Sequence, residues 1–298
     1  MIKVSYLIAL YNKEEFIEDC VNSILVERSE NIDIQVCIVD DGSTDNSLSV
    51  VKRLYSNNPM VKISSFIKNK GKNSAYNRAY EISDGDFFCI IGADDFLVPG
   101  RTKLLHDGFD GLVGGVYGGL FIYDQKDRMV VGEITPKVAK YPNILVENSI
   151  SGGACMFNKE SSHRIFPIPE NLAFEDWWVS FILLKFFEVK KLDSPVLYYR
   201  IHQGNDSGSV CVSYDSVKKD YVRHVDYLNE FENYLDSDSE LQYLKKSKAL
   251  RESFFGGKQL RYLLLKPFDL VWFKTLLFCV FGARFFYFFK NQINKFLG

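Results

Sequence analysis

The residues of this sequence best suited to chemistry are two adjacent carboxylates, Asp94 and Asp95. They follow the apolar run 87–91, which is typical of a short strand buried on both faces of a sheet. Two acids at the end of a buried strand repel each other and lose hydration unless a cation or hydrogen-bond donors compensate them. Carboxylate oxygens are hard ligands that suit Mg2+ or Mn2+. The pair therefore indicates a divalent-metal site, and the alternative is a pair of turn and helix-capping residues.

The composition is that of a folded globular protein. The chain has 298 residues, of which 47% are hydrophobic and 25% are charged, and its formal net charge is -2. This charge creates no overall positive field, so we expect no nucleic-acid partner. The six cysteines include no C-x-x-C pair, which favours buried free thiols in a reducing compartment. The N-terminal apolar run is too short for a signal peptide, so we expect a cytoplasmic location.

The elements that position the acid pair alternate between strands and helices. Strands are expected at residues 4–10, 34–39, 61–66 and 87–91, with helices at 14–26, 46–55 and 76–83 between them. This β-α alternation predicts a parallel, right-handed, doubly wound α/β sheet. Ser43 or Thr44 is expected to cap the helix that begins at residue 46.

Polar residues follow three of these strands. They are the segment 9–13, the pair Asp40-Asp41 and the pair Asp94-Asp95. Ligands of doubly wound sheets bind at the carboxyl ends of the strands, so these residues are expected to converge on one crevice. The convergence favours the ligand-site interpretation of Asp94 and Asp95 over the capping one.

Further polar groups occur where the alternation weakens, after residue 99. A small-residue segment, 151–157, leads into an apolar strand, and glycine there is typical of close backbone approach to a ligand. Glu175 and Asp176 open a helix that runs to about residue 187, where acids also complement the helix dipole. His202 follows an expected strand at 196–201 and precedes a polar loop.

The C-terminal part is predicted to be helical from residue 214 onward. Residues 258–296 combine leucine, phenylalanine and basic residues. Their most apolar run, 275–289, is shorter than the roughly 20 residues that a spanning helix needs. The pattern predicts an interfacial helix with snorkelling cations, and packing on the core is the alternative. We therefore predict a domain at residues 1–210 and a helical extension at 211–298.

The motifs, taken in order, resemble those of the family 2 glycosyltransferases of the GT-A fold. The matching segments, within about residues 3–207, are 4–14, 39–47 (VDDGSTDNS), 69–77, 92–95, 152–157, 175–176 and 199–202. The departures are Ala9-Leu10 in place of Pro-Thr, Tyr76 in place of Arg, Ala79 in place of Gly, and Gly92 in place of the first acid of D-x-D-D. The resemblance implies a Rossmann-like GT-A domain that binds a nucleotide-diphospho-sugar, expected to be a UDP-sugar.

The resemblance also implies roles at the three strand ends. Asp41 would accept a hydrogen bond from the base, and Tyr11 would line the base or stack on it beside Ala9. Lys72, or alternatively Lys70, would contact base or phosphate. The alternatives are a turn-stabilising aspartate, for which Asp40 or Asp45 is better placed, an exposed turn tyrosine and a solvated lysine.

The metal contacts implied by the resemblance come from three residues. Asp94 would lie near the ribose and on the metal, Asp95 would bind Mn2+ or Mg2+, and His202 would ligate the metal or bond a phosphate. Because Gly92 replaces the first acid of the motif, only Asp94 and Asp95 are left to supply carboxylate contacts to the metal. The alternative for His202 is a histidine hydrogen-bonded within its loop.

The acceptor side is implied to lie at the helix that begins near residue 175. Asp176 would be the base that takes the proton of an acceptor hydroxyl in an inverting single displacement. Glu175 would orient it or bind the acceptor. Trp177 or Trp178 would stack on an acceptor sugar ring, with the other indole in the core.

We therefore expect an inverting glycosyltransferase that acts on a glycan or lipid-linked saccharide. The expected setting is cell-surface polysaccharide synthesis, of a capsule or lipopolysaccharide, at the cytoplasmic face of the inner membrane. A nucleotidyltransferase would need a glycine-rich basic loop at residues 11–14, which is absent. A phosphoacceptor regulatory domain would need a shorter chain with a lysine at a later strand end. An inactive sugar-nucleotide-binding protein remains an alternative because of Gly92.

Overall fold

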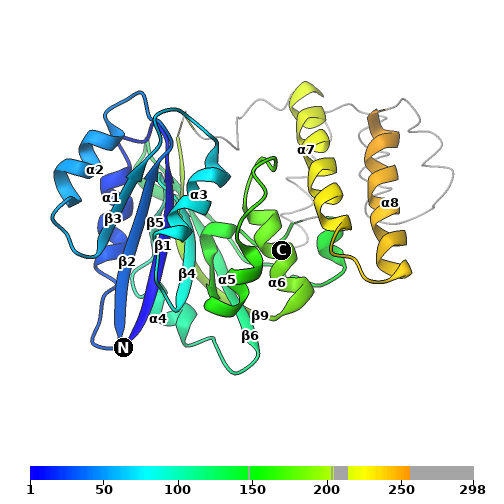
Figure 1. Cartoon of the computed structure of the whole chain (residues 1–298), viewed down its shortest axis with the longest axis horizontal. Coiled ribbons are helices and arrows are strands. Elements are labelled where there is room, and N and C mark those ends of the chain that lie inside the picture. The colour runs from blue at the N-terminus through cyan, green and yellow to red at the C-terminus, as the bar shows by residue number, and fades with distance from the viewer. Residues whose placement is uncertain (147, 203, 205–213, 256–298) are drawn as a thin grey trace. The chain divides into compact units, whose positions relative to one another are not determined.

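The computed structural model describes residues 1–146, 148–202, 204 and 214–255 (Figure 1). The chain divides into two compact units, Met1–His202 and Gln203–Gly298. The prediction of an interfacial helix at 258–296 lies outside the described residues.

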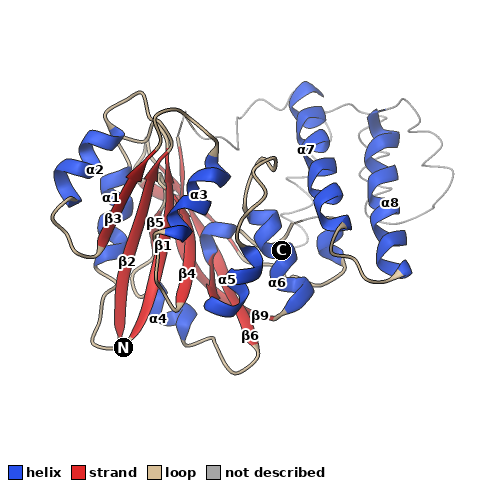
Figure 2. Cartoon of the chain, in the orientation of Figure 1, coloured by secondary structure: helices blue, strands red, loops and turns tan. Residues whose placement is uncertain are grey.

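The first unit is an α/β structure with helices on both faces of one sheet (Figure 2). Its strands are β1 (Ile2–Leu10), β2 (Ile32–Asp40), β3 (Val61–Ser65), β4 (Phe87–Gly92), β5 (Phe96–Leu97), β6 (Val113–Asp124), β7 (Met129–Ile134), β8 (Cys155–Asn158) and β9 (Glu188–Ile201). Its α-helices are α1 (Ile17–Leu25), α2 (Ser47–Tyr55), α3 (Lys72–Glu81), α4 (Arg101–His106), α5 (Lys159–Ile165) and α6 (Asp176–Phe186). Two 3-10 turns, η1 (Asn143–Leu145) and η2 (Gly152–Ala154), precede β8.

The sheet order is β3-β2-β1-β4-β8-β6-β9-β5, with β7 beside β6. The first four strands are parallel, as the alternation predicted, whereas β8 runs antiparallel to β4 and β6. Leu10 pairs with Asp40, and Ala9 pairs with Gly92. The carboxyl ends of β1, β2 and β4 therefore lie side by side, which confirms the predicted convergence of the three strand ends.

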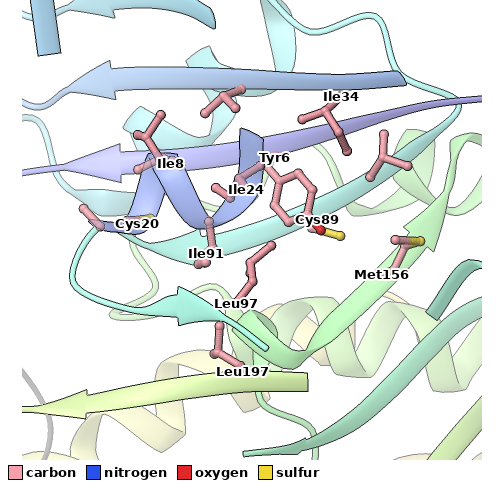
Figure 3. Packing of buried hydrophobic residues seen from close by; sticks show 14 of the residues in the cluster. Tyr6, Ile8, Cys20, Ile24, Ile34, Cys89, Ile91, Leu97, Met156 and Leu197 are labelled. Carbon is pink, nitrogen blue, oxygen red and sulfur yellow. The ribbon is translucent and has the colours of Figure 1, made fainter. Parts of the chain in front are cut away.

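The alternation of side chains along β1 divides the core between the two faces of the sheet. Tyr6 and Ile8 belong to a buried cluster that includes Cys20 and Ile24 of α1 (Figure 3). Helix α3 contacts β1 and β2 and completes the sandwich of helix, sheet and helix. The four cysteines of the described part, Cys20, Cys37, Cys89 and Cys155, are free and buried, which confirms the expectation for those positions.

The start of α2 differs from the prediction. Neither Ser43 nor Thr44 caps it, because the N–H of Ser47 donates to Asp45 Oδ1 at 2.9 Å. The N–H of Asn46 donates to Glu14 Oε2 at 2.8 Å, across 32 residues of sequence. A carboxylate from the turn after β1 therefore takes part of the capping that the local sequence assigned to a hydroxyl.

Helix α3 begins at Lys72, four residues before its predicted start. Gly71, with φ +102°, makes the turn that precedes it. The Asp41 carboxylate accepts the N–H groups of Lys70 and Gly71 at 2.7 and 3.0 Å. These long-range bonds fix the start of the helix, and a local pattern does not contain them.

The described part of the second unit is a pair of helices, α7 (Tyr214–Glu232) and α8 (Asp238–Phe255). Leu228, Phe231 and Leu244 are buried, and Lys248 forms an ion pair with Glu232. Among the described residues, no helix is long and apolar enough to cross a membrane.

Candidate active site

Asp94, in the turn after β4, is held by two partners. Its Oδ2 atom lies 2.8 Å from Lys13 Nζ and 3.1 Å from His202 Nε2. Burial alone would raise the pKa of Asp94, but the charge and hydrogen bond of Lys13, together with the hydrogen bond from His202, outweigh burial and the pKa is lowered. Asp94 is therefore kept ionised by a lysine from the carboxyl end of β1.

The pKa of the next residue, Asp95, is shifted in the opposite direction. Its Oδ1 atom accepts the main-chain N–H of Arg200 at 2.9 Å. Burial and the neighbouring charge of Asp94 raise the pKa of Asp95 to about 8. The two adjacent acids therefore carry about one negative charge at neutral pH in the structure as it stands.

Gly92 provides a test of whether these acids fit a metal ion. A Cβ atom at Gly92 would lie 2.9 Å from Asp94 Oδ1 and 3.2 Å from Asp95 Oδ2. One oxygen of each carboxylate therefore faces the same small space, which a side chain would fill. Two convergent carboxylate oxygens suit a hard divalent cation. Across the described ranges, no cluster of three or more histidine, cysteine and acidic side chains is arranged for a metal, so the fit rests on this oxygen pair.

The predicted nucleotide contacts surround the ends of β1 and β2. Tyr11 is 42% exposed, and Ala9 is partly buried at the end of β1. Asp41 is buried, and burial raises its pKa although the N–H groups of Lys70 and Gly71 bind its carboxylate. Both Asp41 oxygens thus hold the loop before α3, and each retains a lone pair for a further donor.

Lys72, predicted to contact base or phosphate, binds an acid at the start of α6, and its contact with a nucleotide stays a prediction. Its Nζ atom forms an ion pair with Glu175 Oε2 at 3.0 Å and lies over the rings of Tyr76 and Phe174. Burial lowers the pKa of Lys72, but the charge and hydrogen bond of Glu175, together with the charges of Tyr76 and Asp176, outweigh burial and the pKa is raised. The structure therefore brings Lys72 to the acid pair at the start of α6.

Two asparagines of α3 strengthen the same connection. Asn73 Nδ2 donates to the carbonyls of Pro169 and Leu172 at 3.1 and 2.8 Å. Asn77 donates to the Ile168 carbonyl at 2.9 Å and accepts its N–H at 2.7 Å. The N-x-G-x-x-x-A-x-N segment of the sequence therefore ties α3 to the loop that leads into α6.

Asp176 is the first residue of α6 and is partly exposed. Burial of its carboxyl and the charge of Glu175 raise the pKa of Asp176 to about 6, against the opposing charge of Lys72. Gly152 permits this placement, because a Cβ there would lie 3.2 Å from Asp176 Cβ. The structure thus shows a close approach of this glycine to the start of α6, whereas the approach to a ligand stays a prediction.

The two tryptophans of α6 both belong to the core. Trp177 and Trp178 are 3% and 1% exposed. Their indole N–H groups donate to the carbonyls of Ile144 and Ile165 at 2.7 and 2.8 Å. Neither ring presents a face to solvent, which corrects the expectation that one of them stacks on an acceptor sugar.

Sequence reasoning predicted no role for two residues, Lys13 and Arg200. Lys13 lies within the segment 9–13 that the strand-end argument placed at the crevice, but its pairing with Asp94 was not predicted. Arg200 is a charge within an otherwise apolar strand segment and is only 3% exposed. A buried arginine requires partners, and that requirement was the available signal.

Comparison with known proteins identifies the family. The sequence model described as "Glycosyl transferase family 2" matches residues 5–164. An uncharacterised glycosyltransferase of Nostoc sp., alr2836, is 26% identical over 246 residues, which cover 78% of this chain and 75% of that protein. The chondroitin synthase of Pasteurella multocida is 42% identical over 101 residues, which are 34% of this chain and 10% of that enzyme. The chain therefore spans only a small part of the synthase that it matches.

Solved structures show the same fold. TarS residues 1-349 from S. aureus, in complex with UDP-GlcNAc, has a TM-score of 0.60 at 19% identity over 95% of this chain and 82% of that one. The mannosyltransferase PcManGT from Pyrobaculum calidifontis, in complex with GDP-Man and Mn2+, has a TM-score of 0.57 at 17% identity over 84% of this chain and 69% of that one. Likeness at this identity establishes the fold alone. Together with the family match, it shows that this chain is a glycosyltransferase of family 2 with a GT-A-type fold.

Proposed function

We propose that this chain transfers a sugar from a UDP-sugar to a hydroxyl of a glycan or lipid-linked saccharide, with inversion at the anomeric carbon. The observation that carries the proposal is electrostatic. We call the carboxyl ends of β1, β2 and β4, with Asp94 and Asp95, the strand edge. The charge of Lys72 lowers the pKa of both Asp95 and Asp176, so an acid of the strand edge and the acid of α6 lie within reach of one cation. A donor at the strand edge and a base on α6 would thus act on the same sugar.

The donor would bind across the ends of β1, β2 and β4. Asp41, Tyr11 and Ala9 would hold the base, with Asp41 using its remaining lone pairs. Asp94 and Asp95 would hold Mn2+ or Mg2+ between the oxygens that face Gly92. Such an ion supplies positive charge to a departing diphosphate.

His202 would keep Asp94 in position. Its Nε2 atom lies at Asp94 Oδ2, whereas Asp94 Oδ1 faces Gly92. This arrangement supports a role beside the metal-facing oxygen, and direct ligation of the metal by His202 stays a prediction.

Asp176 would accept the proton of the acceptor hydroxyl as that oxygen attacks the anomeric carbon. A pKa of about 6 leaves the carboxylate ionised at neutral pH and more basic than an exposed aspartate. Glu175, held by Lys72, would keep its charge next to Asp176 and orient the acceptor. The reaction is a single displacement, so no side chain of the protein forms a covalent bond with the sugar.

The acceptor class is proposed from the relatives and the tail. The chondroitin synthase match supports polysaccharide synthesis, and a capsule or lipopolysaccharide is the proposed product class. We propose a catalytic domain at 1–210 and an extension at 211–298 that binds the cytoplasmic face of the inner membrane through 258–296. A chain shortened after residue 255 should lose binding to anionic liposomes, and unchanged binding would contradict the membrane proposal.

The donor proposal is tested by thermal-shift measurements with UDP-GlcNAc, UDP-glucose and GDP-mannose, each with and without Mn2+. We expect a UDP-sugar to raise Tm, and Mn2+ to increase that rise. Absence of a shift with every donor would contradict the proposal. Binding without turnover in the presence of glycan acceptors would favour an inactive sugar-nucleotide-binding protein instead.

A further inference from the structure

Arg200 of β9 contacts both acids of the strand edge. Its main-chain N–H donates to Asp95 Oδ1 at 2.9 Å. Its side-chain Nε donates to the main-chain carbonyl of Asp94 at 2.7 Å. One residue therefore fixes the carboxylate of Asp95 and the backbone from which the Asp94 carboxylate projects.

The two Nη atoms and the face of the guanidinium also have partners. Its Nη2 donates to Asp19 Oδ2 of α1 at 3.1 Å, and its Nη1 donates to Gln125 Oε1 at the end of β6. Three rings surround its Cζ atom: Phe16 at 5.2 Å, Phe96 at 4.8 Å and Tyr123 at 5.6 Å. The acid pair is thus braced against α1, β5 and β6 through a side chain that is 3% exposed.

The three side-chain donations, to the Asp94 carbonyl, Gln125 and Asp19, require an arginine, whereas the main-chain N–H that binds Asp95 does not depend on the side chain. The guanidinium is a rigid planar fork that donates from Nε and both Nη atoms in fixed directions, whereas a lysine ammonium is a single point of charge. The positive charge also offsets part of the repulsion that Asp95 experiences from Asp94. Arg200 binds the other oxygen of Asp95, Oδ1, and the main chain of Asp94, and these contacts orient the two carboxylates whose remaining oxygens, Asp94 Oδ1 and Asp95 Oδ2, face Gly92.

We propose that Arg200 is a positioning residue that sets the spacing of the Asp94 and Asp95 oxygens for a divalent cation and the donor diphosphate bound to it. This inference rests on the proposed function, because it assigns Arg200 to the donor site proposed above. Arg200 itself needs no contact with the donor. Groups that orient metal-binding carboxylates typically contribute about 10- to 100-fold to metal affinity.

The experiment compares Arg200→Met and Arg200→Lys with Arg101→Met. Arg101 is the matched control, because it is 1% exposed and lies 5.8 Å from the Tyr6 ring, but its Nη2 atom donates to the Cys155 carbonyl. Calorimetric titration of UDP with and without Mn2+ separates metal-dependent affinity from general stability.

We expect Arg200→Met to weaken Mn2+-dependent UDP binding about 10- to 100-fold while metal-free binding changes little. Arg200→Lys should restore little of the loss, and Arg101→Met should lower Tm without changing affinity. Equal affinity losses in Arg200→Met and Arg101→Met, or no loss in a folded Arg200→Met, would overturn the proposal.

If Arg200→Met fails to fold, the proposal is tested with Asp19→Ala instead. The Asp19 side chain is 63% exposed, so its removal loosens the Nη2 contact without opening the core. A weaker Mn2+-dependent affinity supports the proposal, and an unchanged affinity overturns it. A wild-type protein that binds no UDP with Mn2+ would contradict the proposed function itself, a result distinguishable from failure of Arg200 alone.

Discussion

The strand edge and the start of α6 hold their acids in similar pairs that differ in one respect. In each pair a lysine binds one acid, Lys13 at Asp94 and Lys72 at Glu175, and the pKa of the neighbouring acid is raised. The raised value is about 8 for Asp95 and about 6 for Asp176.

This difference suits the two regions to different chemistry. An acid with a pKa of about 8 is protonated at neutral pH until a cation displaces the proton. An acid with a pKa of about 6 is ionised at neutral pH and can accept a proton. The edge is thus suited to binding a cation and the start of α6 to general-base catalysis.

The largest expected effect is on turnover in Asp176→Asn. An amide cannot accept the hydroxyl proton, so kcat should fall by about 10²- to 10⁴-fold, the usual contribution of a general base. Steady-state rates with the donor found by thermal shift measure this loss. Asp45→Asn, a carboxylate that caps α2, is the control. Retention of wild-type kcat by Asp176→Asn would place the base elsewhere.

The next effect is that of Gly92→Ala at the strand edge. The added Cβ would lie 2.9 Å from Asp94 Oδ1 and 3.2 Å from Asp95 Oδ2, so it would displace the Asp94 oxygen and occupy the space that both oxygens face. We expect a loss of about 10- to 100-fold in Mn2+-dependent UDP affinity, measured by calorimetry. Gly132→Ala in β7 is the control, because its Cβ would meet Ile122 no closer than 3.4 Å. Unchanged affinity in Gly92→Ala would show that the space over Gly92 is not the metal position.

Lys72→Met, which removes the cation bound to Glu175, is expected to have a smaller effect than the two variants above. It leaves the buried Glu175 carboxylate without its lysine, at a cost of about 1–3 kcal/mol of unfolding free energy. The Lys72 side chain is 36% exposed, so we expect the lower end of this range, measured by urea unfolding. The pKa of Asp176 should rise, and the acidic limb of the kcat/KM profile should move to higher pH.

Lys70→Met is the control for Lys72→Met. It removes a nearby lysine, in the loop before α3, whose ammonium lies over the Phe66 ring at 4.6 Å. An equal shift of the kcat/KM profile in both variants would show that Lys72 has no specific effect on the pKa of Asp176.

The smallest effect is the pH dependence of the wild-type protein. The ionised form of Asp176 is the base, so kcat/KM should rise with pH and level off above about 6. The folded pKa lies above the ordinary value of 3.8, so the folded state binds more protons than the unfolded state between these values. The Asp176 contribution to stability therefore decreases as pH rises through this window, and Asp176→Asn should remove it from pH-dependent urea unfolding. Retention of both pH dependences in Asp176→Asn would assign them to another group.

Much of the strand edge could be predicted from the sequence. Asp41, Asp94 and Asp95 each follow an apolar run, and the topology of a parallel sheet aligns the ends of such runs. Lys13 belongs to the segment 9–13 that the same rule placed at this crevice, although its pairing with Asp94 was not predicted.

The α6 region could not be predicted in the same way. Asn73 and Leu172 bond across 99 residues of sequence, and Lys72 meets Glu175 across a similar span. The resemblance implied that one of the two adjacent tryptophans stacks on an acceptor sugar while the other lies in the core. Helix α6 is instead buried from Trp177 to Leu183, so both indoles lie in the core.

The most direct test is calorimetric titration of UDP with Mn2+ into Asp95→Asn and Asp176→Asn side by side. We predict that Asp95→Asn weakens binding by about tenfold or more, whereas Asp176→Asn changes it by less than about twofold. Such a result would assign donor binding to the strand edge and proton transfer to α6. Equal weakening in both variants, or weakening in Asp176→Asn alone, would contradict this division between the two regions.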